Sequence, residues 1–140
     1  MEIRCYAHGE GDFWYRMGPF LASAAVRREL GAAISSDEST TWWLAVDDDG
    51  RTLGFVAARR RGKVWEFRHD YVVPEARGKD VYRTLFRARL EACSQSGAAI
   101  AKATVNARSL PMYQEHGFVP VSQRGQYTVV QKELKTHEPV

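Results

Sequence analysis

The sequence predicts a mixed α/β (α+β) domain built on one sheet, and two features of the chain lead to this class. Residues 41–73 hold three segments rich in β-branched and aromatic residues, separated by turn sequences, which is the pattern of an antiparallel meander. Residues 64–105 then read as strand, helix and strand, which implies parallel neighbours joined by a right-handed crossover. No repeat or linker divides the 140 residues, so we predict one domain over residues 1–134 and a polar tail over 135–140.

The first half of the chain is punctuated by clear turn signals. Apolar residues 12–33, interrupted at Gly18-Pro19 and closed by Gly31, predict one or two helices. Pro74 ends the third strand of the meander because proline donates no ladder hydrogen bond. The strands expected in this half are residues 3–6, 41–46, 52–58 and 64–73.

The second half begins with a long helix that runs to about Gln95 and stops at Gly97. Its apolar residues recur with helical spacing, which predicts one buried stripe. That stripe contains Val81, Leu85, Ala88 and Ala92, flanked by Tyr82, Phe86 and Leu90. After it we expect a strand at 98–105, a short helix at 109–116, and strands at 118–121 and 127–134.

Composition and charge exclude several classes of protein. The formal charge of +3 and the pI near 9.0 permit acidic ligands without demanding nucleic acid. Cys5 and Cys93 have no metal or redox spacing, and the histidines have no partners at ligand spacing, so we predict no metal. No apolar stretch approaches the roughly 20 residues of a membrane span, and the first residues lack a signal-peptide core. We expect a soluble, cytoplasmic protein with no membrane association.

Two segments carry a recognisable pattern. Residues 72–85 end a strand in Val-x-Pro and continue through Arg77, Gly78 and Lys79 into the long helix. Unpaired amides and the positive end of the helix dipole make such a turn an anion site. Residues 106–118 read N-A-R-S-L-P-M-Y-Q-E-H-G-F.

Together these segments resemble the signature of the GCN5-related N-acetyltransferase (GNAT) superfamily, and the resemblance extends from about Thr41 to Leu134. It implies a mostly antiparallel sheet of six to seven strands, with helices on both faces and one parallel strand pair around the cofactor cleft. It also implies an N-acyltransferase that moves an acetyl or other acyl group from acetyl-CoA or another acyl-CoA to a primary amine. The acceptor would be a small molecule or a protein, and the amine would attack directly in a ternary complex. The resemblance places these residues at the cofactor: Val72, Val73, Arg77, Gly78, Lys79, Asp80, Val81, Tyr82, Asn106, Ser109 and Tyr113.

Two positions depart from the family pattern. Asp80 stands where the family loop has Gly, and Tyr82 stands where it has Gly or Ala. A carboxylate about 4 to 5 Å from a phosphate repels it by roughly 1 kcal/mol in water-like surroundings. Alternatively, Asp80 caps the helix and occupies the anion site itself.

Catalytic roles can be assigned to a small number of side chains. The resemblance implies that Tyr113 protonates the leaving thiolate; the alternative is an aromatic that only packs the short helix. The oxyanion would contact a backbone amide near Val72. Candidates for the general base are Glu66, His69 and Asp70, on a strand where charged neighbours are unusual. Strict alternation puts Glu66, Arg68, Asp70 and Val72 on one face, and the alternative to a catalytic role is that the three charged residues form a satisfied ion-pair row.

Other functions remain open at the level of the sequence. An altered phosphate loop and the basic turn at 59–63 are compatible with a Mom-like GNAT-fold enzyme that modifies DNA bases. A solvated hairpin tip is the favoured interpretation of that turn, so a nucleic-acid partner is possible but not favoured. A non-catalytic GNAT-like binding domain is the third alternative. The oligomeric state is open, and a homodimer is compatible with the sequence.

Overall fold

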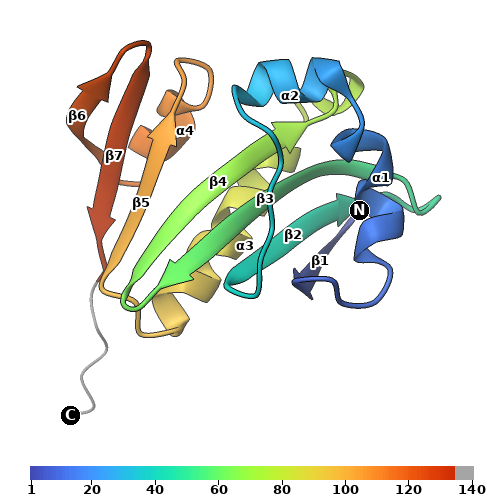
Figure 1. Cartoon of the computed structure of the whole chain (residues 1–140), viewed down its shortest axis with the longest axis horizontal. Coiled ribbons are helices and arrows are strands. Elements are labelled where there is room, and N and C mark those ends of the chain that lie inside the picture. Colours follow the sequence, from blue (N-terminus) through green and yellow to red (C-terminus); the bar gives the residue numbers. More distant parts are fainter. Residues whose placement is uncertain (135–140) are drawn as a thin grey trace.

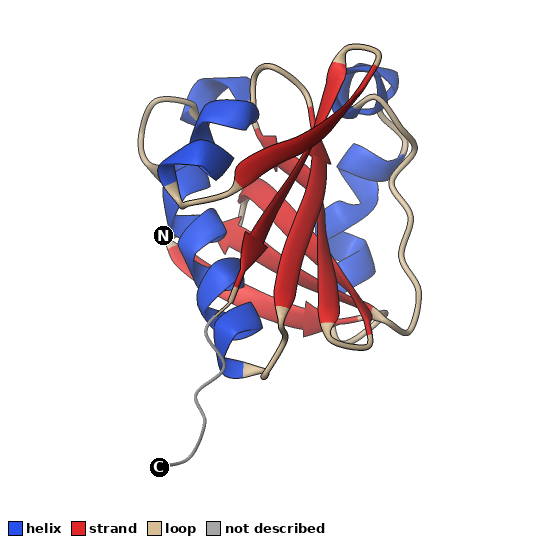
Figure 2. Cartoon of the chain, turned by 90° about the vertical axis from the view of Figure 1, so that its left-hand side faces the viewer, coloured by secondary structure: helices blue, strands red, loops and turns tan. Residues whose placement is uncertain are grey.

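One twisted sheet with helices on both faces forms the protein, as the computed structural model shows for residues 1–134 (Figures 1 and 2). The sheet order is β1-β2-β3-β4-β5-β7-β6, and every neighbouring pair is antiparallel except β4 and β5. This confirms the predicted fold class. The strands are β1 (Glu2–Ala7), β2 (Thr40–Val46), β3 (Thr52–Arg61), β4 (Val64–Val72), β5 (Ile100–Val105), β6 (Val119–Arg124) and β7 (Tyr127–Glu133).

The helices divide between the two faces of the sheet. They are α1 (Phe13–Leu21), α2 (Ala24–Leu30), α3 (Val81–Gln95) and α4 (Leu110–Glu115), with a 3₁₀ turn at Pro74–Ala76. One core layer packs α3 and α4 against the sheet, and a second layer packs α1 and α2 against the opposite face. Within residues 1–134, no helix is both long and apolar enough to cross a membrane. The tail predicted for residues 135–140 lies outside the described residues.

The only parallel pair described in the sheet is short. The pairing of β4 with β5 begins at Val64 and Ile100 and ends at Phe67 and Ala103. Beyond this point β4 remains hydrogen-bonded to β3, and β5 remains hydrogen-bonded to β7. The two strands therefore separate towards their carboxyl ends, and the start of α3 lies beside the opening (Figure 1).

A β-bulge in β4 reverses the predicted side-chain pattern. The register passes from Ala57 opposite Arg68 to Phe55 opposite Tyr71, and His69 adopts a left-handed backbone with φ 59°. The extra residue moves His69 onto the α1/α2 face, where it stacks on Trp42. Asp70 turns instead towards α3. The predicted alternation was therefore wrong beyond Arg68.

The predicted ion-pair row on β4 does not form. Glu66 pairs with Arg61 at 3.2 Å, whereas Asp70 pairs with Arg89 of α3 at 2.7 Å. Arg68 donates a hydrogen bond to the Ser35 hydroxyl at 3.1 Å. Each charged side chain of β4 thus has its own partner on a different element.

Candidate active site

The turn before α3 presents free backbone donors. The first-turn N–H groups of α3, at Val81, Tyr82 and Arg83, meet no acceptor within residues 1–134. Asp80 sits at the N-cap with φ 61°, but its side chain makes no capping hydrogen bond. The Asp80 carboxylate is 77% exposed and pairs with Arg83 at 2.6 Å. It therefore leaves the amides free, contrary to the alternative in which it fills the anion site.

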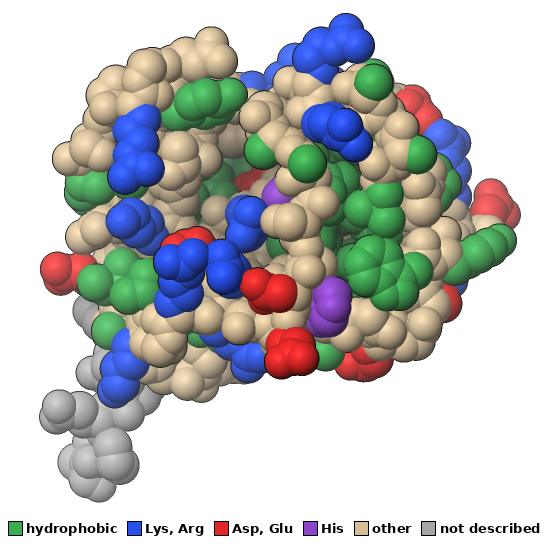
Figure 3. Space-filling model, viewed as in Figure 1, with side chains coloured by type: hydrophobic (Ala, Val, Ile, Leu, Met, Phe, Trp, Pro, Cys, Tyr) green, Lys and Arg blue, Asp and Glu red, His purple; other side chains and the backbone are tan. Residues whose placement is uncertain are grey.

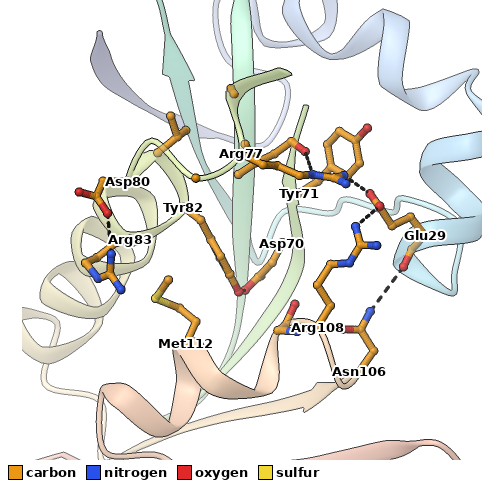
Figure 4. A pocket seen from close by; sticks show the side chains of 15 residues that line it. Glu29, Asp70, Tyr71, Arg77, Asp80, Tyr82, Arg83, Asn106, Arg108 and Met112 are labelled. Atoms are coloured by element: carbon orange, nitrogen blue, oxygen red, sulfur yellow. Dashed lines mark hydrogen bonds and ion pairs between the residues drawn. The ribbon is translucent and has the colours of Figure 1, made fainter. Parts of the chain in front are cut away.

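A cavity of about 320 Å³ lies between this turn, the end of β4 and the loop before α4 (Figure 4). Eight of the eleven residues assigned to the cofactor line it: Val72, Arg77, Gly78, Asp80, Val81, Tyr82, Asn106 and Ser109. Val73 and Lys79 do not line it, and the Val73 N–H is bound to the Leu53 carbonyl on β3 at 2.9 Å. We name this space the loop cavity.

A salt-bridge network closes one end of the loop cavity. Glu29 at the end of α2 pairs with Arg77 at 2.6 Å and also with Arg108. Arg77 in addition donates from Nε to the Val72 carbonyl at 3.0 Å. Figure 4 shows Glu29 between the two arginines, so one carboxylate links the turn before α3 to the loop after β5.

Asp70 is the centre of a buried polar cluster. Its two oxygens accept from the Arg89 guanidinium at 2.7 and 2.9 Å. Oδ2 also accepts from the Tyr82 hydroxyl at 2.5 Å and from the Tyr113 hydroxyl at 2.8 Å. Arg89 is 0% exposed and Asp70 only 7% exposed. The bulge at His69 makes this cluster, because it aims Asp70 at α3.

Both tyrosines of the cluster keep their protons. Burial raises the pKa of Tyr113 well above 10; the Arg89 charge opposes this rise and the Asp70 carboxylate adds to it. Burial and the same carboxylate raise the pKa of Tyr82. Burial is the largest influence on Arg89 and would lower its pKa, but the Asp70 charge and hydrogen bond, together with the Tyr113 and Tyr82 phenols, outweigh burial and raise the pKa. The cluster is therefore a carboxylate that receives hydrogen bonds from one guanidinium and two neutral phenols.

A second, larger cavity of about 530 Å³ opens on the other face of the sheet, between β4, β5, the β6–β7 hairpin and the loop after α2. We name it the basic cleft after Arg68, Lys102 and Arg124, which line it. Figure 3 views this face, where Lys and Arg side chains surround a hollow. Tyr127 closes one wall and packs against Gly31, where a Cβ would lie 2.4 Å from the Tyr127 hydroxyl oxygen.

A small cavity of about 60 Å³ lies where β4 and β5 separate, and it shares lining residues with both of the larger spaces; we name it the connecting cavity. It shares Asp70, Asn106 and Ser109 with the loop cavity. It shares other residues with the basic cleft, among them Phe67, Arg68 and Tyr127. Tyr113 also lines it. Tyr113 and Asp70 therefore line the small cavity that lies between the two larger ones.

The three candidate bases occupy different positions. Glu66 and His69 line the basic cleft, and Asp70 lines the loop cavity and the connecting cavity. Burial lowers the pKa of His69 to about 4, with a further lowering by the Arg68 charge. Its Nε2 accepts the Ser35 N–H at 3.3 Å, so it is a neutral imidazole at neutral pH.

Two residues at the centre of the site were not predicted from the sequence. Arg89 lies four residues after Leu85 and four before Cys93, both fully buried on α3, so helical spacing gave a signal for its burial. Glu29 gave no such signal, because its partners lie 48 and 79 residues further along the chain.

The aromatic residues at the start of the chain do not line either large cavity: Phe13 is buried in the α1/α2 layer, while Trp14 and Tyr15 are exposed.

This arrangement is typical of one class of protein: a sheet that divides between two parallel strands, a helix start with free amides beside the division, and a cavity on each face. The family model of the acetyltransferase (GNAT) domain matches residues 17–130. The chain therefore belongs to the GNAT acetyltransferase family, whose members transfer acyl groups from coenzyme A.

Solved structures share the fold at low sequence identity. The structure is similar to Escherichia coli ElaA, with a TM-score of 0.77 and 18% identity over 94% of this chain and 99% of the other. An acyl-CoA N-acyltransferase from Pseudomonas aeruginosa gives a TM-score of 0.76 and 14% identity, over 94% and 98%. PaiA N-acetyltransferase from Thermoplasma acidophilum, solved in complex with coenzyme A, gives 0.62 and 15%, over 95% and 99%. No curated protein matches the sequence.

The residues beside the division of the sheet fit a coenzyme A thioester. Free amides at the start of α3 suit a diphosphate, and Asp80 points away from them towards Arg83 (Figure 4). Tyr82 occupies a family Gly or Ala position, yet its side chain runs along the loop cavity to Asp70. The bulk of Tyr82 thus becomes part of the wall.

Proposed function

We propose that the protein is an acyl-CoA-dependent N-acyltransferase that acylates a primary amine by direct attack in a ternary complex. The observation that supports the proposal is that the small cavity lined by Tyr113 shares residues with two larger cavities on opposite faces of the sheet. The loop cavity, with the free amides of α3, would hold the donor, and the basic cleft would hold the amine. A bound acyl-CoA supplies the thioester carbonyl that the amine attacks.

The chain's own groups divide the remaining work. Tyr113 would donate a proton to the departing sulfur, after its hydroxyl turns from Asp70 to the new acceptor. Asp70 and Arg89 hold the Tyr113 oxygen in place, since Arg89 Nη2 also reaches that oxygen at 3.2 Å. Of the three candidate bases, Glu66 lies on the amine side and would receive the proton directly or through water. His69 is a weaker candidate because of its lowered pKa.

Acetyl-CoA is expected to raise the melting temperature of the protein. A ligand that binds only the native state stabilises it, by about 2.7 kcal/mol at a hundredfold excess over Kd. Thermal unfolding with and without acetyl-CoA measures this effect. Adenosine monophosphate, which has no diphosphate, is the control that tests whether the diphosphate is needed. If acetyl-CoA leaves the unfolding curve unchanged, the proposed donor site does not exist.

Replacing Asp80 by Gly is expected to tighten acetyl-CoA binding about fivefold. The change removes a carboxylate near the diphosphate, worth roughly 1 kcal/mol at an exposed position, and gives the left-handed residue a glycine. Calorimetry measures the Kd of both proteins. Asp80→Asn is the matched control, since it removes the charge but keeps a side chain that tolerates φ 61°. Unchanged or weaker binding in both variants would show that Asp80 does not oppose the phosphates.

A further inference from the structure

The basic cleft is lined by more positive than negative side chains. Arg68, Lys102 and Arg124 come from three different strands and line one cavity. No carboxylate of residues 1–134 lies within 4.0 Å of the charged nitrogens of these three side chains. Glu66 is the acidic residue that lines the cleft, and it is already paired with Arg61 at 3.2 Å.

Like charges gathered around one cavity repel each other, and an anion placed between them removes that repulsion. The lowering of the His69 pKa has a contribution from Arg68, so the positive charge acts inside the cleft as well as on its rim. A volume of about 530 Å³ is in the range of small-molecule sites.

The same charges constrain the acceptor of the proposed reaction. An ammonium ion entering alone would be repelled, so binding requires a second group of opposite sign on the same molecule. Once the molecule is bound, nearby cations lower the pKa of its amine and favour the neutral form that can attack a thioester.

We infer that the acceptor is a small primary amine that also carries an anionic group, a carboxylate or a phosphate, held by Lys102, Arg124 and Arg68 in the basic cleft. This inference rests on the proposed function for the identity of the amine, but the anion preference of the cleft stands by itself. The anionic group lies in the cleft, and the amine points through the connecting cavity towards Tyr113.

Four amines of similar length test the inference: 4-aminobutyrate, 3-aminopropyl phosphate, 4-aminobutanamide and 1,4-diaminobutane. Their binding is measured by calorimetry on the protein with and without coenzyme A, and their acetylation is measured with acetyl-CoA. We expect at least one anionic amine to bind about tenfold more tightly than the neutral amide, because charge-assisted hydrogen bonds are the stronger ones. The comparison of the first two amines separates a carboxylate site from a phosphate site.

The variant Lys102→Gln/Arg124→Gln should abolish the anionic preference while leaving the Kd of acetyl-CoA within twofold. Arg60→Gln is the control, because Arg60 is an exposed arginine of β3 that does not line the cleft. Equal affinities for anionic and neutral amines, or a preference that survives in the double variant, would overturn the inference. Failure of acetyl-CoA to bind would overturn the proposed function instead, and the amine titrations without coenzyme A would still decide the anion preference.

Discussion

Arg89→Met is expected to lower the free energy of unfolding by about 3–5 kcal/mol, as measured by urea denaturation. The substitution keeps much of the packing of a side chain whose guanidinium lies 4.1 Å from the Phe67 ring centroid. It removes the charge that neutralises Asp70, which is 7% exposed and cannot be solvated in place. Two phenol donors remain, but they bring no positive charge to the carboxylate.

Arg83→Met is the matched control, because it makes the same change on the same helix. Arg83 is 34% exposed and pairs with Glu115 and Asp80 near solvent, so its loss should destabilise the protein far less than the loss of Arg89. The double variant Asp70→Leu/Arg89→Met should recover most of the stability, since an apolar pair avoids burying an unpaired charge. Equal losses in the two single arginine variants would show that the Asp70–Arg89 pair is not the main electrostatic feature of this core.

Tyr113→Phe is expected to lower kcat for amine acetylation about a hundredfold while changing the Kd of acetyl-CoA less than threefold. General acid catalysis contributes about 10²–10⁴-fold, and the phenol retains its shape and packing without the proton. Steady-state kinetics with a substrate identified among the four amines gives kcat, and calorimetry gives the Kd. The pH dependence of kcat should change as well, because the proton donor is then solvent.

Tyr82→Phe provides the comparison, since it removes the same hydroxyl from the same acceptor, Oδ2 of Asp70. Tyr82 lines the loop cavity but not the connecting cavity, so we expect less than a fivefold change in kcat. If the two variants lose the same activity, the tyrosines act only by holding Asp70. If Tyr113→Phe keeps full activity, Tyr113 is a packing residue of α4, the alternative considered from the sequence.

Local sequence signals were sufficient for the elements of the fold. Turn residues and periodicity predicted each strand and helix, with α3 ending at Gln95 as expected. The loop motif also located the start of α3, because free amides and a helix dipole are properties of a short segment. The strand β3 runs three residues beyond the expected end, so Arg59 to Arg61 extend the sheet instead of forming the turn.

The arrangement of side chains in the site depends on features that alternation alone does not encode. A bulge adds one residue at His69, and this single change exchanges the faces of all following side chains on β4. Asp70 consequently meets Arg89 and Tyr113, at sequence separations of 19 and 43 residues. A periodic reading of the strand cannot find such a partner, because it assumes a regular ladder.

The bridge made by Glu29 has a consequence for ligand entry. Beyond the last β4–β5 pair, at Phe67 and Ala103, the two halves of the sheet are joined across the opening by Arg77 and Arg108 on one carboxylate. That carboxylate is an internal competitor for both arginines. A polyanion that binds Arg77 or Arg108 would have to displace Glu29 from that arginine, so its binding would break a salt bridge that joins α2 to the loops after β4 and β5.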